Sequence, residues 1–394
     1  MLKRGTVNLP LHYGHAPSYL IKRMIKLSST ISTIIIEEKG SKEFFKRISD
    51  PLWFQAFGCV LGFDWHSSGL TTVVTGVLKQ SINSETHGIS VSGGKGINAI
   101  KPKYEIPKLA EKNHTLSTNQ INNLVYASKM SAKIDNAAIQ DGFSLYHHVI
   151  FFDNYGNWTI IQQGLSEKSK MARRYHWISD DLVDYIIEPH KGIIGNERIS
   201  SCLNMTSKNS EENRKTCVDL IKEGSESIKS SINKINKIPS SENLDNWIYE
   251  ATSHHNCKMF LNDRQAIEKY EMPQTLNWRT MDELYDITPT NYEDLISQKG
   301  VGPSLIRALS LISEIIYGNR ASWKDPVKYN YAHGGKDGLP YPIARNTYDK
   351  SIKYLSEVIS GSKIEKKERI ASLKRLSTYS NILFNTTDYN YDDK

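Results

Sequence analysis

Four aspartates in the N-terminal half of this 394-residue chain could support metal or acid–base chemistry. They are Asp64, Asp135, Asp141 and Asp153. They lie among aromatic and apolar stretches, where a carboxylate is costly to bury unless it is paired or functional. Mg²⁺ prefers carboxylate ligands together with phosphate oxygens. One hypothesis is therefore an Mg²⁺-bound water that attacks a phosphodiester while Arg173 or Arg174 holds the phosphate.

A second hypothesis uses the same region to bind a base flipped out of a duplex. Three aromatic residues could stack on such a base: Trp65, Tyr146 and Trp177. Gln162 or Gln163 could read the edge of the base, and Lys133 could act as an amine nucleophile. Asp135 or Asp141 would then stabilise charge or activate water. The two hypotheses predict a nuclease and a glycosylase, respectively.

Several of these side chains also have structural explanations. A lone buried aspartate is more often a helix cap or an arginine partner than a metal ligand. His147 is a further catalytic candidate, but His147 and His148 alternate across a predicted strand, which argues against a shared zinc ion. The run 93–96 lacks the GxxxxGK[ST] spacing of an ATP site, so we expect a tight turn or a loop whose Lys95 contacts phosphate.

The strongest pattern lies in residues 291–317, where a helix, a bend and a second helix are predicted. The first helix ends at Gly300, and the fixed φ of Pro303 suits the start of the second. Gly300 and Gly302 permit backbone torsions that other residues resist, and Val301 can pack between them as an apolar anchor. The amides at the start of the second helix then form an anion site. The other side chains expected at this site are Lys299, Ser304 and Arg307.

This pattern resembles the helix-hairpin-helix motif of DNA glycosylases, polymerases and ligases, which grips a DNA phosphate without reading sequence. Two positions differ from that motif. Ile306 stands where a small alanine is usual, and Ser304 stands where glycosylases with lyase activity carry a lysine. The resemblance therefore implies phosphate binding without that lyase chemistry. The structural alternative is a pair of helices whose glycines serve only as caps.

The elements that must position these residues follow from hydrophobic spacing. Apolar residues recur at helical intervals over 17–39 and 42–48, and a further helix is predicted over 119–138. Two runs, 145–152 and 158–163, flank a turn rich in Asn and Gly, which predicts a β-hairpin. The segment 97–118 is polar and is expected to be a loop.

The predicted fold class is α+β: a mixed N-terminal domain with a β-hairpin, followed by an all-α domain. The boundaries are 1–200 for the first domain, 201–243 for a polar linker or solvated helix, and 244–378 for the helical domain. Two helices are expected near its end, over 345–360 and 364–377, the second of them basic. The last residues, 379–394, are predicted to be disordered.

The composition narrows the class of protein. Hydrophobic residues make up 39% of the chain and the net charge is +7, which permits a phosphate-rich partner without requiring one. No apolar run approaches the roughly 20 residues needed to cross a bilayer. The four cysteines show no CxxC pair, so we expect reduced thiols, a cytoplasmic protein and no membrane partner.

Short runs along most of the chain resemble a family of uncharacterised archaeal and bacterial proteins, described as domain of unknown function 763. The runs are 8–12, 14–17, 54–55, 62–69, 93–96, 132–138, 140–142, 146–148, 162–164, 172–177 and 332–338. What the resemblance implies is DNA binding through the bend and a role in repair or processing. A lysine is common in that family where this chain has Ser304.

These patterns predict a protein that binds the DNA backbone with little regard to sequence. The expected activity is that of a glycosylase or an Mg²⁺-dependent nuclease acting on damaged or structured DNA. The alternative is a DNA-binding or recruitment factor without catalysis. An RNA-processing factor fits less well, because the motif usually follows a duplex backbone.

Overall fold

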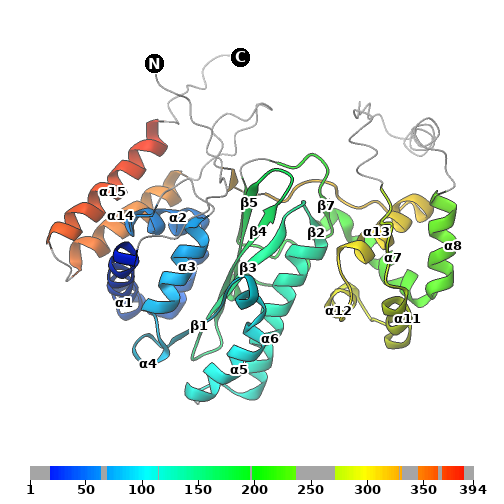
Figure 1. Cartoon of the computed structure of the whole chain (residues 1–394), viewed down its shortest axis with the longest axis horizontal. Coiled ribbons are helices and arrows are strands. Elements are labelled where there is room, and N and C mark those ends of the chain that lie inside the picture. The colour runs from blue at the N-terminus through cyan, green and yellow to red at the C-terminus, as the bar shows by residue number, and fades with distance from the viewer. Residues whose placement is uncertain are drawn as a thin grey trace.

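The computed structural model describes residues 18–63, 69–113, 115–195, 198–236, 271–327, 329–330, 345–362 and 366–385. A central β-sheet lies between two groups of helices (Figure 1). This arrangement belongs to the α+β class, as the sequence predicts. No helix within these ranges is both long and apolar enough to span a membrane.

The sheet is antiparallel apart from one edge, where β6 and β8 run parallel. In spatial order its strands are β1 (Ile89–Lys95), β3 (Ser144–Asp153), β4 (Trp158–Ser166), β5 (Met171–Ile178), β6 (Gly192–Gly195) and β8 (Tyr329–Asn330). The predicted hairpin is confirmed as β3 and β4. Its turn is held by Asp153, whose carboxylate accepts the amides of Tyr155 and Asn157. A separate pair joins β2 (Ile139–Gln140) to β7 (Leu203–Asn204).

One face of the sheet is covered by the first helices of the chain and by the last two. They are α1 (Ser18–Ser49), α2 (Pro51–Val60), α3 (Gly69–Ser81), α4 (Ser84–His87), α14 (Arg345–Gly361) and α15 (Lys366–Asn385). Helix α1 is interrupted at Gly40, whose φ is 83°, so the two helices predicted over 17–39 and 42–48 are confirmed. The two predicted C-terminal helices are confirmed as well. Helix α15 continues to Asn385, into the segment expected to be disordered, and residues 386–394 lie outside the described part of the chain.

The other face carries two further layers of helices. Against the sheet lie η1 (Gly96–Ile100), α5 (Pro102–Asn113), α6 (Thr118–Lys133) and the π-helical turn η2 (Ile134–Ala138). Beyond them lie α7 (Glu211–Lys222), α8 (Ser225–Asn236), α11 (Trp278–Ile287), α12 (Tyr292–Ser297) and α13 (Pro303–Tyr317). Short 3₁₀ turns, η3 (Ser179–Asp181) and η4 (Lys208–Ser210), complete the described helices.

Two segments differ from the sequence prediction. The expected loop over 97–118 contains η1 and α5, because Pro102 begins a helix whose Ile106 and Ala110 are buried. The segment 201–243, expected to be a polar linker or a solvated helix, contains the helices α7 and α8, whose apolar sides pack on α13 and belong to the core. In both segments polar residues outnumber the apolar ones, so the narrow apolar stripe that packs against the core was not recognised in the sequence.

The last two helices do not pack beside α13. Leu355, Val358 and Leu376 are buried in the same apolar cluster as α1, α2 and α3. Figure 1 shows α14 and α15 on the opposite side of the sheet from α13. The described helices of 244–378 therefore split between the two sides, and the basic face of α15 does not extend the surface around the predicted bend.

Candidate functional site

The bend between α12 and α13 has the backbone geometry that its sequence predicts. Helix α12 ends at Ser297, and Gly300 adopts a φ of 84°, in the left-handed region that favours glycine. Gly302 is extended and caps α13 without a side chain, and Pro303 takes the first helical position. Gly300 is exposed and Gly302 is half-buried, so the main chain of the bend faces solvent.

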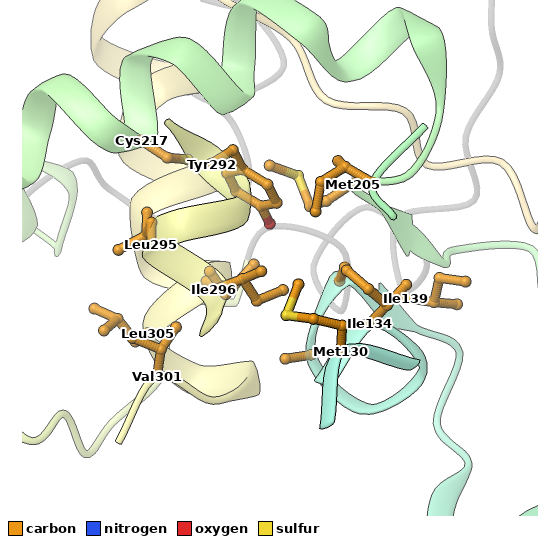
Figure 2. Close-up of a cluster of buried hydrophobic side chains, with 14 of the residues drawn as sticks. Met130, Ile134, Ile139, Met205, Cys217, Tyr292, Leu295, Ile296, Val301 and Leu305 are labelled. Carbon is orange, nitrogen blue, oxygen red and sulfur yellow. The ribbon is translucent and has the colours of Figure 1, made fainter. Parts of the chain in front are cut away.

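Val301 anchors the bend from below. Its side chain is 3% exposed and lies in an apolar cluster with Leu305 and Ile296. Figure 2 shows Ile296 directed toward Met130 of α6, so the cluster joins α12 and α13 to the layer that covers the sheet. Burial of an apolar side chain of this size contributes about 1.5–3 kcal/mol. The anchor therefore fixes the backbone around it while leaving the glycines at the surface.

The first turn of α13 has main-chain donors without a backbone acceptor in the described part of the chain. Within the described residues, the amide of Ile306 is the first one after the bend that donates to a backbone carbonyl, that of Gly302. Pro303 has no amide proton, so the orphan donors of the first turn are those of Ser304 and Leu305. Depressions of about 400 and 310 Å³ flank Pro303 and Ser304. Ser304 is exposed and lines both depressions, whereas Leu305 is buried, and the helix dipole favours negative charge at this end of α13.

Lys133 supports the bend from the end of α6. Its Nζ donates to the carbonyl oxygens of Gln298 at 2.8 Å and Val301 at 2.6 Å. Burial, together with the nearby charge of Lys129, lowers the pKa of Lys133 to about 8. Because a trans peptide directs its C=O and N–H in opposite directions, this contact turns the amides of Lys299 and Gly302 away from Lys133. The structure thus places the predicted nucleophile as a brace for the bend.

The cationic side chains predicted at the bend are held differently. Lys299 is exposed and free to move toward a ligand, whereas Arg307 is half-buried. Arg307 donates to the carbonyl of Glu271 and lies over the ring of Trp323. It lines the smaller of the two depressions together with Ser304. Its position at the rim is fixed by these contacts.

Asp135 lies at the centre of a buried hydrogen-bond network. It is fully buried, and its carboxylate accepts from Gln162 Nε2 at 2.6 Å, from Trp177 Nε1 at 3.0 Å and from His190 Nε2. Burial raises the pKa of Asp135, although these donors oppose the rise. The network continues from Gln162 Oε1 to His148 Nδ1 at 2.7 Å.

Ser128 closes the outer end of this network. Its Oγ lies 2.8 Å from His148 Nε2. If every donor points toward Asp135, His148 is neutral, with its proton on Nδ1, and Ser128 donates to Nε2. Burial agrees with this assignment, since it lowers the pKa of His148 to about 4. The network is fully partnered and enclosed, which describes a structural role for Asp135.

Asp141 and Arg173 form a second enclosed group. Arg173 is fully buried between Asp141, at 2.9 Å, and Asp325, at 2.8 Å. Tyr175 donates to the same Asp141 oxygen at 2.7 Å. Breaking such a group typically costs about 3–5 kcal/mol because it leaves a buried charge without a partner. Arg173 cannot reach a phosphate from this position, so its predicted role would require another conformation.

A polar row crosses the other face of the sheet near its end. Lys95, His147, Gln163 and Arg174 stand opposite one another on β1, β3, β4 and β5. Arg174 is buried and donates to Gln55, and His147 lies 2.9 Å from Thr75 on α3. His148 faces the opposite side of the sheet, as the alternation predicts. Gln163 donates to the hydroxyl of Tyr146.

The aromatic and metal candidates are spread apart. Trp177 is fully buried against His190, whereas Tyr146 is half-buried beneath the exposed Lys95. Asp64 and Trp65 lie outside the described residues. Asp153 is engaged in its turn, and the described residues contain no group of three or more His, Cys, Asp or Glu side chains able to hold a metal. Of the predicted Mg²⁺ ligands, the three that the structure describes, Asp135, Asp141 and Asp153, do not form a metal site.

Sequence reasoning missed three residues that complete these groups. His190 is the partner of Asp135, Asp325 is the partner of Arg173, and Thr280 packs against Gly300. The first two lie 55 and 152 residues from their partners, so local spacing gives no signal for them. Thr280 explains why position 300 is glycine: a Cβ there would lie 2.6 Å from its Oγ1.

The buried histidines predict acid sensitivity. Burial lowers the pKa of His147 to about 3 and that of His148 to about 4, from 6.5. Below pH 6.5 the unfolded chain therefore binds more protons than the folded chain, and acid destabilises the fold. Each histidine contributes up to about 1.4 kcal/mol per pH unit. Urea unfolding at pH 7, 6 and 5 should show this fall, and it should be smaller in His147→Gln. An identical pH dependence in the variant contradicts the assignment.

The comparisons with known proteins agree with the sequence resemblance. Neither a curated protein nor a solved structure matches the chain. A family model described as "Protein of unknown function (DUF763)" matches residues 5–343, which include the sheet, its buried networks and the bend. The chain belongs to this DUF763 family.

Proposed function

We propose that this protein binds DNA through the bend at Gly300–Gly302 and acts in DNA repair or processing. The observation that carries the proposal is the pair of main-chain donors without a backbone partner among the described residues at the start of α13, beside the exposed Ser304 and on a bend braced from inside. Amides that are already fixed in place lose little entropy when an anion binds. A DNA phosphate is the anion that fits the open, shallow depressions beside them.

The geometry supports contact with the backbone rather than with bases. Phosphate contacts fix the position of a protein on a duplex but carry no sequence information. Around the bend, the groups that face solvent are amides, the Ser304 hydroxyl and the Lys299 ammonium, all suited to phosphate oxygens. Binding should therefore tolerate any sequence and weaken with salt, with a log–log slope of about −0.9 for each phosphate neutralised on duplex DNA.

Gly302→Asp tests the amides without disturbing the fold. A Cβ at position 302 would meet nothing within 4 Å, and the extended φ of −139° suits any residue. Aspartate at this N-cap would accept the amides of Ser304 and Leu305 and would repel phosphate. We expect an unchanged or higher Tm and a loss of duplex affinity of about tenfold or more, measured by fluorescence anisotropy.

Gly302→Asn is the matched control, because asparagine caps the same amides without a charge. We expect an affinity between those of Gly302→Asp and the original chain. Gly302→Ala leaves the amides uncapped and should bind nearly as the original does. Equal affinity for all four proteins would remove the bend from the interface. Gly300→Ala is unsuitable as a test, since its Cβ would collide with Thr280 and strain the backbone.

Titration of Lys133 predicts a pH dependence of binding. Since its pKa lies at about 8 rather than 10.5, its charge is present below pH 8 and is lost as the pH rises through this value. Duplex affinity should therefore fall between pH 7 and pH 9 at constant ionic strength. Lys133→Met should bind more weakly at pH 7, because the bend loses its brace, and should show a flatter pH profile. A profile with the same slope in both proteins contradicts this role.

Incubation with lesion-bearing oligonucleotides separates an enzyme from a binding factor. Strand breaks that require Mg²⁺ indicate a nuclease, and breaks that appear only after alkali indicate a glycosylase. Of the described catalytic candidates, Asp135, Asp141, His147 and Gln163 are buried. Lys133 donates to the carbonyls of the bend, and both observations favour the binding factor. We therefore expect no product while the same oligonucleotides are bound.

A further inference from the structure

The connection between β1 and α5 exposes large apolar side chains. Ile97 is 76% exposed, Ile100 65% and Tyr104 61%. The turn η1 contains no buried residue, so its isoleucines contribute nothing to the core. Neighbouring exposed apolar residues of this size mark an interaction site more often than isolated ones do. We call residues 95–104 the η1 surface.

The η1 surface has a defined backbone. Gly93, Gly94 and Gly96 all adopt positive φ, and a Cβ at Gly93 would lie 2.2 Å from the carbonyl oxygen of His148. The amide of Lys101 donates to Asn98 at the end of η1. Below the turn, Glu105 accepts from Ser92 and from the amide of Gly93. The apolar side chains are thus presented on a preorganised turn.

The charge of this surface is positive. Lys95, Lys101 and Lys103 are exposed, and none of them forms an ion pair with another described residue. The neighbouring acid, Glu105, is turned inward and paired with Lys79. Lys103 lies over the ring of Tyr104, 4.6 Å from its centroid. An apolar centre with a rim of unpaired ammonium groups is complementary to a partner that combines apolar faces with phosphates.

The η1 surface and the bend lie on either side of α6. Helix α5 packs along α6, and α12 contacts α6 from the other side (Figure 1). Two half-buried residues lie beside the two sites: Gln140 of β2 donates to the carbonyl of Pro303 next to the bend, and Tyr146 of β3 lies beneath Lys95.

We propose that the η1 surface binds unpaired nucleotides next to the duplex held by the bend. This inference rests on the proposed function of the bend. A duplex backbone offers only phosphates and sugars, and exposed isoleucines would gain little from it. Unpaired bases have apolar faces on which Ile97, Ile100 and Tyr104 can pack, while the lysines contact the phosphates between them. The substrate class is thus DNA with a junction between paired and unpaired strands.

The test compares a blunt duplex with the same duplex carrying an unpaired thymidine arm. The double variant Ile97→Ser, Ile100→Ser should lose about tenfold in affinity for the armed duplex, because it removes two of the apolar side chains on which unpaired bases would pack. Its affinity for the blunt duplex should stay within about twofold, since the variant leaves the groups that bind phosphate in place. The matched control is Val183→Ser, Ile370→Ser, which removes exposed apolar side chains elsewhere and should leave both affinities unchanged.

A second variant tests the charged rim. The double variant Lys101→Gln, Lys103→Gln should bind the armed duplex with an affinity that depends less on salt. The log–log slope should become shallower by about 0.7 for each phosphate of the single strand that is no longer neutralised.

Equal affinity of the double serine variant and the original chain for the armed duplex overturns the proposal. The proposal is also overturned if the double serine variant no longer binds phosphatidylserine vesicles but still binds DNA as the original chain does. That result would assign the η1 surface to membrane binding. If the original chain does not bind the blunt duplex, or if Gly302→Asp leaves its affinity for that duplex unchanged, the result contradicts the function proposed for the bend rather than that of the η1 surface.

Discussion

The position of the bend depends on the hydrogen bonds that the buried carboxylate of Asp135 accepts. Inside an apolar layer it has to be matched by donors, and Gln162, Trp177 and His190 supply them from two strands and a loop. This network fixes the end of α6 against the sheet. Two residues earlier, Lys133 extends in the other direction and holds the carbonyls of the bend. A polar core and a surface site are thereby connected through one turn of helix.

The link from the Asp135 network through Lys133 to the bend explains why this core contains polar groups, whose burial costs free energy. Replacing buried polar groups by apolar ones is often neutral or stabilising, so enclosure alone does not justify them. Asp135 belongs to the π-helical turn Ile134–Ala138, which directly follows Lys133, and such turns are frequent at functional sites. Its role here is to direct Asp135 inward while the preceding Lys133 reaches the bend. On this account the buried networks are part of the binding site's support rather than its chemistry.

The sequence predicts local features well and long-range pairing poorly. The β3–β4 hairpin, the break at Gly40 and the bend at Gly300 were all predictable, because glycine, asparagine and proline act within a few residues of their position. A solvated helix was one of the two interpretations of 201–243, but the burial of α7 and α8 in the core was not predictable, since their apolar stripes are narrow and gain meaning only against α13. The docking of α14 and α15 on α2 depends on which apolar face is left uncovered, and spacing along the chain does not show that.

In the candidate site, too, local features could be predicted from the sequence and long-range partners could not. Polar residues in apolar surroundings correctly indicated buried, partnered groups, but residue type does not distinguish a catalytic carboxylate from a structural one. Arg173 donates directly to Asp141 and also to Asp325, a residue far along the chain. Lys133 was singled out for its amine, and only the fold shows that the amine holds two carbonyls. The exposed isoleucines of η1 lie in a segment whose composition is typical of a polar loop, so their exposure had to be observed rather than inferred.

Hydrogen–deuterium exchange with and without a blunt duplex tests whether the main-chain amides of the bend bind DNA, because it measures the protection of those amides. The account predicts that peptides covering the bend and the first turn of α13 exchange more slowly when DNA is bound, and that this protection is absent in Gly302→Asp. Protection confined to other parts of the chain, with the amides of Ser304 and Leu305 exchanging as fast as in the free protein, would contradict it.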